Sequence, residues 1–251
     1  MNNEIVGLTA FVMIFGAALA GIAVAQRLPQ RHLSDQTRTA VSVSVAIVGT
    51  LAALVISLMI SSASNTFSEK SHEVTTVSVD LIRMDHMLRR YGPLAADARA
   101  KLQAYAAAKT QQLFPIEGTP TPTSAASGTM LAAEQDAILA LNPADERQRW
   151  LRTELLTMAD NLGQTRWMLE VGSGHSIPAP FLVLLVLWLA IVFGSFGLFA
   201  PVNPIAIASL FLTSIAVSCG ITLILELDSP LAGMVQVSGA PMRDALALIT
   251  Q

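Results

Sequence analysis

The sequence predicts an all-α integral membrane protein with four transmembrane helices and a helical soluble domain inserted between helices two and three. Three observations support this fold class. No Asp, Glu, Lys or Arg occurs in residues 5–26, 39–68 or 171–225. Hydrophobic residues make up 53% of the chain and charged residues 13%, well below the roughly 25% charged residues of a soluble domain. Most charges lie in residues 69–170, which hold 11 of the 15 Lys and Arg and 13 of the 18 Asp and Glu.

The positions of the transmembrane helices follow from length. A helix that crosses about 30 Å of hydrocarbon at about 1.5 Å per residue needs roughly 20 apolar residues. Residues 5–25 and 41–60 satisfy this requirement. The third uncharged tract is too long for one helix, but Pro201 and Pro204 interrupt it, because proline breaks a helix interior. We therefore expect two further spans, residues 181–200 and 205–225, joined by a tight turn.

The first apolar run is interpreted as a span and not as a cleaved signal peptide. Ala23-Val24-Ala25 resembles a cleavage site. However, the run is about twice as long as the apolar region of a signal peptide, and it is preceded by Glu4 without any Lys or Arg. Four segments are then expected along the chain. They are residues 1–65, with spans one and two and their connecting loop; 66–178, the helical soluble domain; 179–228, the hairpin of spans three and four; and 229–251, a C-terminal tail.

Span two is expected to continue into the soluble domain as one long helix. Between Val41 and Tyr91 the only Gly or Pro is Gly49, and Gly92-Pro93 then supplies a stop. Beyond the span, apolar residues follow steps of three and four, the a/d pattern of packed helices, with Lys70 as the one interruption. These positions are Phe67, Val74, Val77, Leu81, Met84, Leu88 and Tyr91.

The rest of the soluble domain is expected to hold two more helices. One covers residues 94–113, with Leu94 at the start of its apolar side, and residues 114–129, rich in Pro, Thr, Ser and Gly, follow as a loop. The other helix begins at Asn142-Pro143, with Asn142 as its N-cap. Its apolar positions are Leu151, Leu155, Met158, Leu162 and Leu169. Such stripes usually mark helix packing within the domain, which is the preferred interpretation, and they are also compatible with assembly of subunits.

No catalytic constellation occurs in the sequence, so an enzyme is not expected. His32, His72, His86 and His175 are scattered, and there is no phosphate-binding loop or nucleophile elbow. His72 and His86 fall off the a/d positions and are interpreted as solvated residues. Cys219 is the only cysteine, which excludes an intrachain disulfide and a cysteine-rich metal site. The net charge of −3 indicates no nucleic-acid surface, and we expect no cofactor and no metal.

Small residues in spans one, three and four favour close packing of helices in lipid. The pairs in span one are Gly16 with Ala20 and Ala17 with Gly21. Span three offers Gly194 and Gly197, and span four offers Ala216 with Gly220. These are interpreted as packing surfaces.

Span two instead carries a stripe of hydroxyl groups. Thr50, Ser57 and Ser61 recur at helical spacing on one face, with Leu54 and Leu58 beside them. One interpretation is that the hydroxyls only bond the carbonyl four residues earlier in the same helix. The other is a pore face, in which hydroxyls line water and the two leucines form an apolar constriction that closes by dewetting. No ionisable residue lies in any span, which argues against a proton pump or a voltage sensor.

Two carboxylates, Glu226 and Asp228, follow span four directly. Charges commonly mark the end of a span at the water interface. Alternatively, the pair binds a cation or contributes to a ring of negative charge at a pore mouth. Two carboxylates alone are too few for a calcium cage, which takes roughly six to eight oxygens.

Several motifs together resemble those of one family. They are Leu28-Pro29-x-x-His32-Leu33-Ser34, Arg90-Tyr91-Gly92-Pro93, Phe193-Gly194-Ser195-Phe196-Gly197-Leu198-Phe199-Ala200-Pro201-x-Asn203, Leu223-Ile224-Leu225-Glu226-Leu227-Asp228-x-Pro230 and Pro241-Met242-Arg243-Asp244-Ala245-Leu246. Over nearly the whole chain, the sequence resembles the bacterial bestrophin-like membrane protein family, and it is more distantly similar to the bestrophin ion channels. That resemblance implies four spans, a helical cytosolic region, a pentamer and a pore lined by span two. The chain differs from animal bestrophins in having no aromatic constriction in span two and fewer acidic residues after span four.

The expected function is therefore passive ion conduction by a homo-oligomer, a pentamer by resemblance, in the bacterial inner membrane. The expected partners are the lipid bilayer, further copies of the chain and inorganic ions. The alternative is a non-conducting membrane scaffold or sensor whose helical domain binds a partner.

The orientation in the membrane has two competing indications. The loop of residues 26–40 holds Arg27, Arg31 and Arg38, and the positive-inside rule would place this loop in the cytoplasm. The family resemblance places the soluble domain there instead. Following the family, we expect a multi-pass protein with a cytoplasmic soluble domain.

Overall fold

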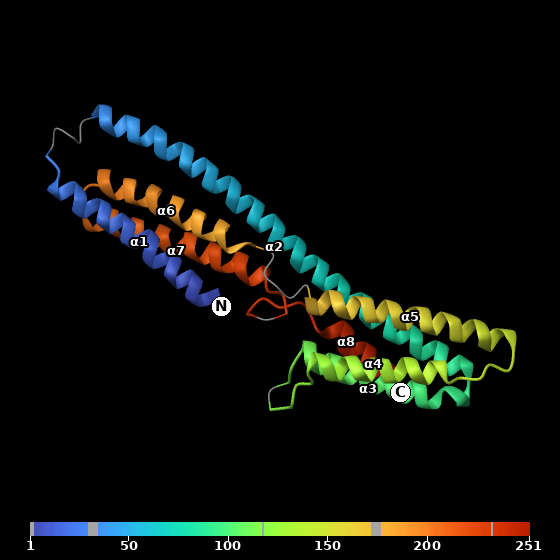
Figure 1. Ribbon diagram of the computed structural model, residues 1–251. Coiled ribbons are helices and arrows are strands. Elements are labelled where there is room, and N and C mark those ends of the chain that lie inside the picture. The colour runs from blue at the N-terminus through green and yellow to red at the C-terminus, as the bar shows by residue number, and fades with distance from the viewer. Residues whose placement is uncertain (1–2, 30–34, 117, 172–176, 232) are drawn as a thin grey trace. The chain divides into compact units, whose positions relative to one another are not determined.

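The computed structural model describes residues 3–29, 35–116, 118–171, 177–231 and 233–251. These residues form helices and turns with no β-strand, so the all-α prediction is confirmed for the described part of the chain (Figure 1). They group into two compact units, residues 1–67 with 175–235 and residues 68–174 with 236–251. Residues 236–251, expected in a separate tail, thus group with the second unit. Arg31, His32 and His175 lie outside the described residues.

The first unit contains α1 (Asn3–Arg27), the first part of α2 (Asp35–Tyr91), α6 (Ala179–Phe199) and α7 (Pro204–Leu227). All four helices are long and apolar enough to cross a membrane. The continuous helix predicted from the lack of Gly and Pro is confirmed, because α2 runs unbroken for 57 residues. It ends before Gly92, whose φ of 108° lies in the left-handed region that favours glycine.

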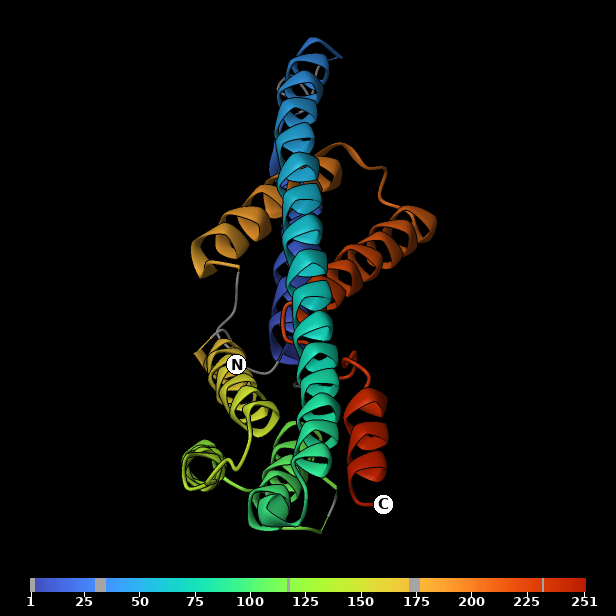
Figure 2. The ribbon, with the colours of Figure 1, turned by 90° about the vertical axis from the view of Figure 1, so that its right-hand side faces the viewer.

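The predicted break between the last two spans is also confirmed. Helix α6 ends at Phe199, and Pro204 is the first residue of α7. Between them Asn203 acts as the N-cap of α7, since its side-chain oxygen accepts a hydrogen bond from the Ala206 amide at 2.7 Å. Figure 2 shows α6 and α7 running back from this connection apart from each other, and α1 packs against both helices.

Glycines allow the backbones of α1 and α6 to touch. A Cβ placed at Gly21 would overlap the carbonyl oxygen of Gly194, and one placed at Gly197 would overlap the carbonyl oxygen of Ala18. The small-residue prediction therefore holds for these positions. It does not hold within the single chain for Gly16 and Gly220, because a Cβ at either position would meet nothing within 4 Å.

The second unit contains the rest of α2, a 3₁₀ turn (Pro93–Ala95), α3 (Ala96–Leu113), α4 (Ser124–Leu139), α5 (Glu146–Val171) and α8 (Ala240–Ile249). The predicted a/d positions form its core. Along α2 those at most 3% exposed are Val74, Val77, Leu81, Met84, Leu88 and Tyr91. Lys70, which interrupts the pattern, is also buried, and its Nζ donates hydrogen bonds to Glu73 Oε2 and to the Met168 carbonyl, both at 2.9 Å. Phe67, the first predicted position, is only half-buried and lies in the first unit. From Val74 onward the pattern predicts burial correctly, and local pairing satisfies the one charged member.

Two predictions about the helices that follow α2 are wrong. Leu94 was expected on an apolar side but is 66% exposed, because it lies in the 3₁₀ turn before α3. The loop expected over residues 114–129 is shorter, because α4 begins at Ser124 with Thr123 as its N-cap. Gly128 lies inside this helix, where a Cβ would lie 2.7 Å from Nη1 of Arg166. A composition typical of a loop is thus overridden by capping and by close packing.

The start of α5 also differs from the prediction. Asp145 precedes the helix, and its Oδ1 accepts a hydrogen bond from the Gln148 amide at 2.7 Å. Asp145, and not Asn142, is therefore the N-cap. The five predicted apolar positions of α5 are all buried, at most 4% exposed. His72 and His86 are exposed, as expected for residues off the a/d positions.

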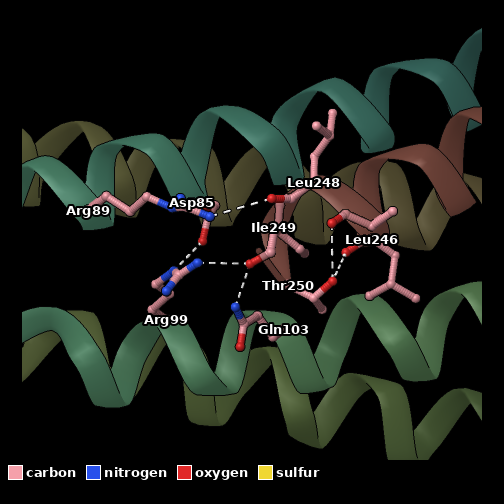
Figure 3. Close-up of polar contacts among 9 residues, drawn as sticks. Asp85, Arg89, Arg99, Gln103, Leu246, Leu248, Ile249 and Thr250 are labelled. Carbon is pink, nitrogen blue, oxygen red and sulfur yellow. Dashed lines mark hydrogen bonds and ion pairs between the residues drawn. The ribbon is translucent and has the colours of Figure 1, made fainter.

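A polar cluster fastens α8 to α2 and α3 (Figure 3). Asp85, 2% exposed, accepts hydrogen bonds from Arg89 Nε at 2.7 Å and from Arg99 Nε at 2.6 Å. Arg99 Nη2 and Gln103 Nε2 donate to the carbonyl oxygen of Ile249, at 2.9 and 2.5 Å. Carbonyls at a helix C-terminus lack intrahelical partners, so the cluster satisfies the end of α8 and holds it in the second unit.

Candidate ion pathway

The membrane part of α2 has one covered face and one uncovered face. Val45, Ala52, Met59 and Ala63 are at most 8% exposed and pack into the core of the first unit. At 3.6 residues per turn, the predicted pore-lining positions fall on the opposite side of the helix. They are Thr50, Leu54, Ser57, Leu58 and Ser61, and all five are exposed in the single chain.

The uncovered face combines hydroxyl groups with large apolar side chains. Leu54 is 58% exposed and Leu58 is 71% exposed. From Thr50 to Ser61 the face extends about 16 Å along the helix axis. The Thr50 hydroxyl donates a hydrogen bond to the Ala46 carbonyl at 2.8 Å, so the simpler interpretation of the stripe holds for that residue. Its oxygen still has lone pairs with which to accept a hydrogen bond from water.

Of the four apolar helices, α2 is the least covered by the rest of the chain. Only 17% of its most apolar 18-residue window is buried, against 28% for α1, 33% for α6 and 22% for α7. In lipid, helices associate through packing and interhelical hydrogen bonds and not through the hydrophobic effect. The face of α2 is thus available to other copies of the chain or to lipid.

The two acidic residues after span four are buried by other segments of the chain. Glu226 is 5% exposed; its Oε1 accepts a hydrogen bond from Asn3 Nδ2 at 3.1 Å and its Oε2 accepts one from the Met234 amide at 2.6 Å. The backbone of Gly233 packs directly against the same carboxylate, since a Cβ there would overlap Glu226 Oε2. The φ of Gly233 is 137°, in the region that favours glycine. Glu226 therefore joins the C-terminal end of α7 to the start of α1 and to the loop after α7.

Asp228 has a similar connecting role. It is 3% exposed, and its Oδ2 accepts a long hydrogen bond from the Ile177 amide at 3.5 Å. The structure thus brings Glu226 and Asp228 to one end of the first unit, each engaged with a different segment. Within the described residues, no group of three or more His, Cys, Asp or Glu is placed to hold a metal ion.

Comparison with known proteins adds one decisive match. A family model described as the Bestrophin-like domain matches residues 12–242. The chain belongs to the bestrophin-like family. The resemblance seen in the sequence motifs is therefore confirmed, and membership together with the apolar helices makes this bestrophin-like chain a multi-pass membrane protein.

Solved structures share the bestrophin-like fold. Two crystal structures of a bacterial bestrophin homologue from Klebsiella pneumoniae, each with one mutation, match at 14% and 16% identity and TM-scores of 0.65 and 0.68. They cover 98% and 97% of this chain and 99% of each of those chains. A crystal structure of a membrane protein matches at 15% identity and a TM-score of 0.66, over 97% of this chain and 98% of that one. No curated protein matches.

Sequence reasoning missed the partners of the acidic pair in this bestrophin-like chain. Asn3 belongs to no sequence motif, and 223 positions of sequence separate it from Glu226, whose carboxylate it contacts. Gly233 gave a weak signal, since a glycine close after an acidic helix end often marks a position with positive φ.

Proposed function

We propose that the chain is a homo-oligomeric ion channel, in which the second transmembrane helix lines the pore and ions pass passively. The observation that supports this proposal is the uncovered face of α2, which carries Thr50, Leu54, Ser57, Leu58 and Ser61 opposite the buried face of the same helix. Rotationally related copies, five by resemblance to bestrophins, would direct these faces towards a common axis.

The chemistry of the proposed pore is that of a hydroxyl-lined, uncharged path. Hydroxyls can replace part of the hydration shell of an ion, whereas Leu54 and Leu58 would form a ring that excludes water when it is narrow. Because residues 39–68 contain no ionisable side chain, conduction would not depend on protonation within the span.

Glu226 and Asp228 belong to the proposal as a candidate ion-binding pair or pore mouth. Both side chains are carboxyl groups at the C-terminal end of α7, and a carboxylate that accepts one or two hydrogen bonds keeps lone pairs for a cation. The proposed setting is the bacterial inner membrane, with four spans and with residues 66–178 as a cytoplasmic domain.

Planar-bilayer recording of the purified oligomer tests the proposal. We expect Leu54→Ala to increase the current several-fold, because it widens the apolar constriction. Leu187→Ala is the matched control, since Leu187 is also exposed, at 52%, but lies on α6. Recording the current of Asp228→Asn over a series of calcium concentrations tests whether the acidic pair takes part in ion binding.

A folded oligomer that carries no current at any pH or calcium concentration tried would sink the channel proposal. If Leu54→Ala and Leu187→Ala behave alike, α2 does not line the pore. An unchanged calcium response in Asp228→Asn would remove that residue from ion binding.

The second candidate function is a non-conducting scaffold or sensor that binds a partner through the second unit. It is favoured by Trp150 and Trp167 of α5, which are 62% and 58% exposed, because exposed tryptophans often mark binding surfaces. This alternative predicts a sealed oligomer, so the same recordings separate the two functions.

A further inference from the structure

A groove lies between α2 and α6 on the first unit, away from the proposed pore face. Its volume is about 540 Å³, within the roughly 300–1,000 Å³ typical of small-ligand sites. One wall comes from α2, with Val45 and Gly49, and the other from α6, with Val192 and Phe196. Most of the lining is apolar, and it belongs to the membrane part of the chain.

Arg38 is the one charged side chain among the described residues that line this groove, and it lies at one end. Arg38 lies in the first turns of α2 and is exposed. Among the described residues, its side chain has no hydrogen bond or ion pair. The next charged residue along α2 is Glu69, because residues 39–68 are uncharged. An anionic group bound at this end of the groove would therefore meet the positive charge of Arg38. Asp35 is the one carboxylate of α2 in this part of the helix.

The length of the groove matches one leaflet of a bilayer. Arg38 and Gly49 are 11 residues apart, which corresponds to about 16 Å along the helix. Half of the hydrocarbon thickness is about 15 Å. At the inner end, a Cβ on Gly49 would meet nothing within 4 Å, so the groove is open there.

We propose that this groove binds one acyl chain of an anionic phospholipid, whose phosphate pairs with Arg38. A guanidinium matches a phosphate with two parallel hydrogen bonds, while the walls of α2 and α6 cover the hydrocarbon. A phospholipid fits this groove in three ways. Its phosphate would meet the charge of Arg38, its acyl chain would contact the apolar lining, and the groove is about as long as one leaflet is thick. This site requires only a membrane-inserted chain and does not depend on ion conduction.

Native mass spectrometry of the oligomer tests the site. Purified protein is exposed to phosphatidylglycerol or to phosphatidylcholine with identical acyl chains. We expect roughly tenfold greater retention of phosphatidylglycerol, because its headgroup keeps a net negative charge for Arg38, whereas the choline cation offsets the phosphate of phosphatidylcholine. Arg38→Gln should abolish this preference, and Gly49→Leu should reduce retention of both lipids by filling the groove.

Arg27→Gln is the matched control for charge, since Arg27 ends α1 and does not line the groove. It should leave the preference for phosphatidylglycerol unchanged, and the mass of each intact oligomer shows whether a variant is folded and assembled. Equal retention of the two lipids by the original chain, or an unchanged preference in Arg38→Gln, would overturn the proposal. A disulfide that forms between two copies at Ala46→Cys, in a Cys219→Ser background, would also overturn the proposal. Another copy of the chain would then occupy the groove.

Discussion

At the residue scale, Glu134 of α4 is the most completely buried of the described carboxyl groups. Its side chain is fully buried, and neither carboxylate oxygen has a hydrogen-bond partner within the described structure. Burial raises the pKa of Glu134 from 4.5 to about 8. The folded protein therefore holds this residue protonated at neutral pH, because an ionised carboxylate without a partner is costly to bury.

The raised pKa predicts how stability depends on pH. Between pH 4.5 and about 8, the folded protein binds a proton at Glu134 that the unfolded chain has released. The contribution of Glu134 to the stability of the folded protein is therefore greatest below pH 4.5 and falls as pH rises towards 8. The total change is a few kcal/mol, since one pKa unit corresponds to about 1.4 kcal/mol.

Glu134→Gln should remove this pH dependence and raise the melting temperature at pH 8, because the amide is neutral at every pH. Thermal unfolding from pH 5 to 8.5 measures the effect, with Glu69→Gln as an exposed control. A variant that follows the original pH profile would show that Glu134 is not the group responsible.

At the element scale, glycines determine how closely the membrane helices approach. Gly21, Gly194 and Gly197 lie where the backbones of α1 and α6 touch, whereas Gly16 lies on an open part of α1. The same residue type in the same pair of helices thus has different roles, depending only on which face is covered.

This difference gives a matched pair of substitutions. Gly197→Ala should lower stability by about 1–3 kcal/mol, because the added methyl group overlaps the Ala18 carbonyl and forces the helices apart. Gly16→Ala should be neutral or stabilising by up to about 1 kcal/mol, because alanine favours helix. Thermal stability of the purified protein in detergent measures both. Equal losses from the two substitutions would contradict the assigned α1–α6 contact.

At the scale of the whole molecule, one helix takes part in two differently solvated units. Residues of α2 up to Phe67 belong to the first unit and those from Ser68 to the second. The first part is uncharged from Thr39 onward, and the second carries charges together with an apolar seam. A single unbroken helix therefore passes from the membrane part of the chain to its polar part.

Labelling of single cysteines should establish the orientation that we propose. In a Cys219→Ser background, Asp35→Cys should react with a membrane-impermeant maleimide added from the periplasmic side. Pro120→Cys should react only after the inner membrane is opened. Both positions are exposed, and Cys219 is the only native thiol. The reverse pattern would place the second unit outside the cytoplasm, as the positive-inside rule suggests.

Much of the fold could be predicted because helix formation depends on local properties. Uncharged runs located the four helices that are long and apolar enough to cross a membrane. The absence of Gly and Pro predicted an unbroken α2, and the a/d spacing identified the buried positions of the second unit. Predictions that depended on detailed capping were less successful. Asn142 and Asp145 are both suitable N-cap residues, and only the folded backbone places Asp145 at the start of α5.

By itself, the sequence determined the helix content, the apolar candidate spans, the family resemblance and the row of hydroxyl and leucine residues on α2. Only the tertiary structure decided that this row is uncovered, and that Glu226 and Asp228 are buried against Asn3, Met234 and Ile177. The physical reason is the range of the interactions. Periodicity and charge act within a few turns of helix, whereas the coverage of a helix face depends on segments that can lie more than 200 residues away.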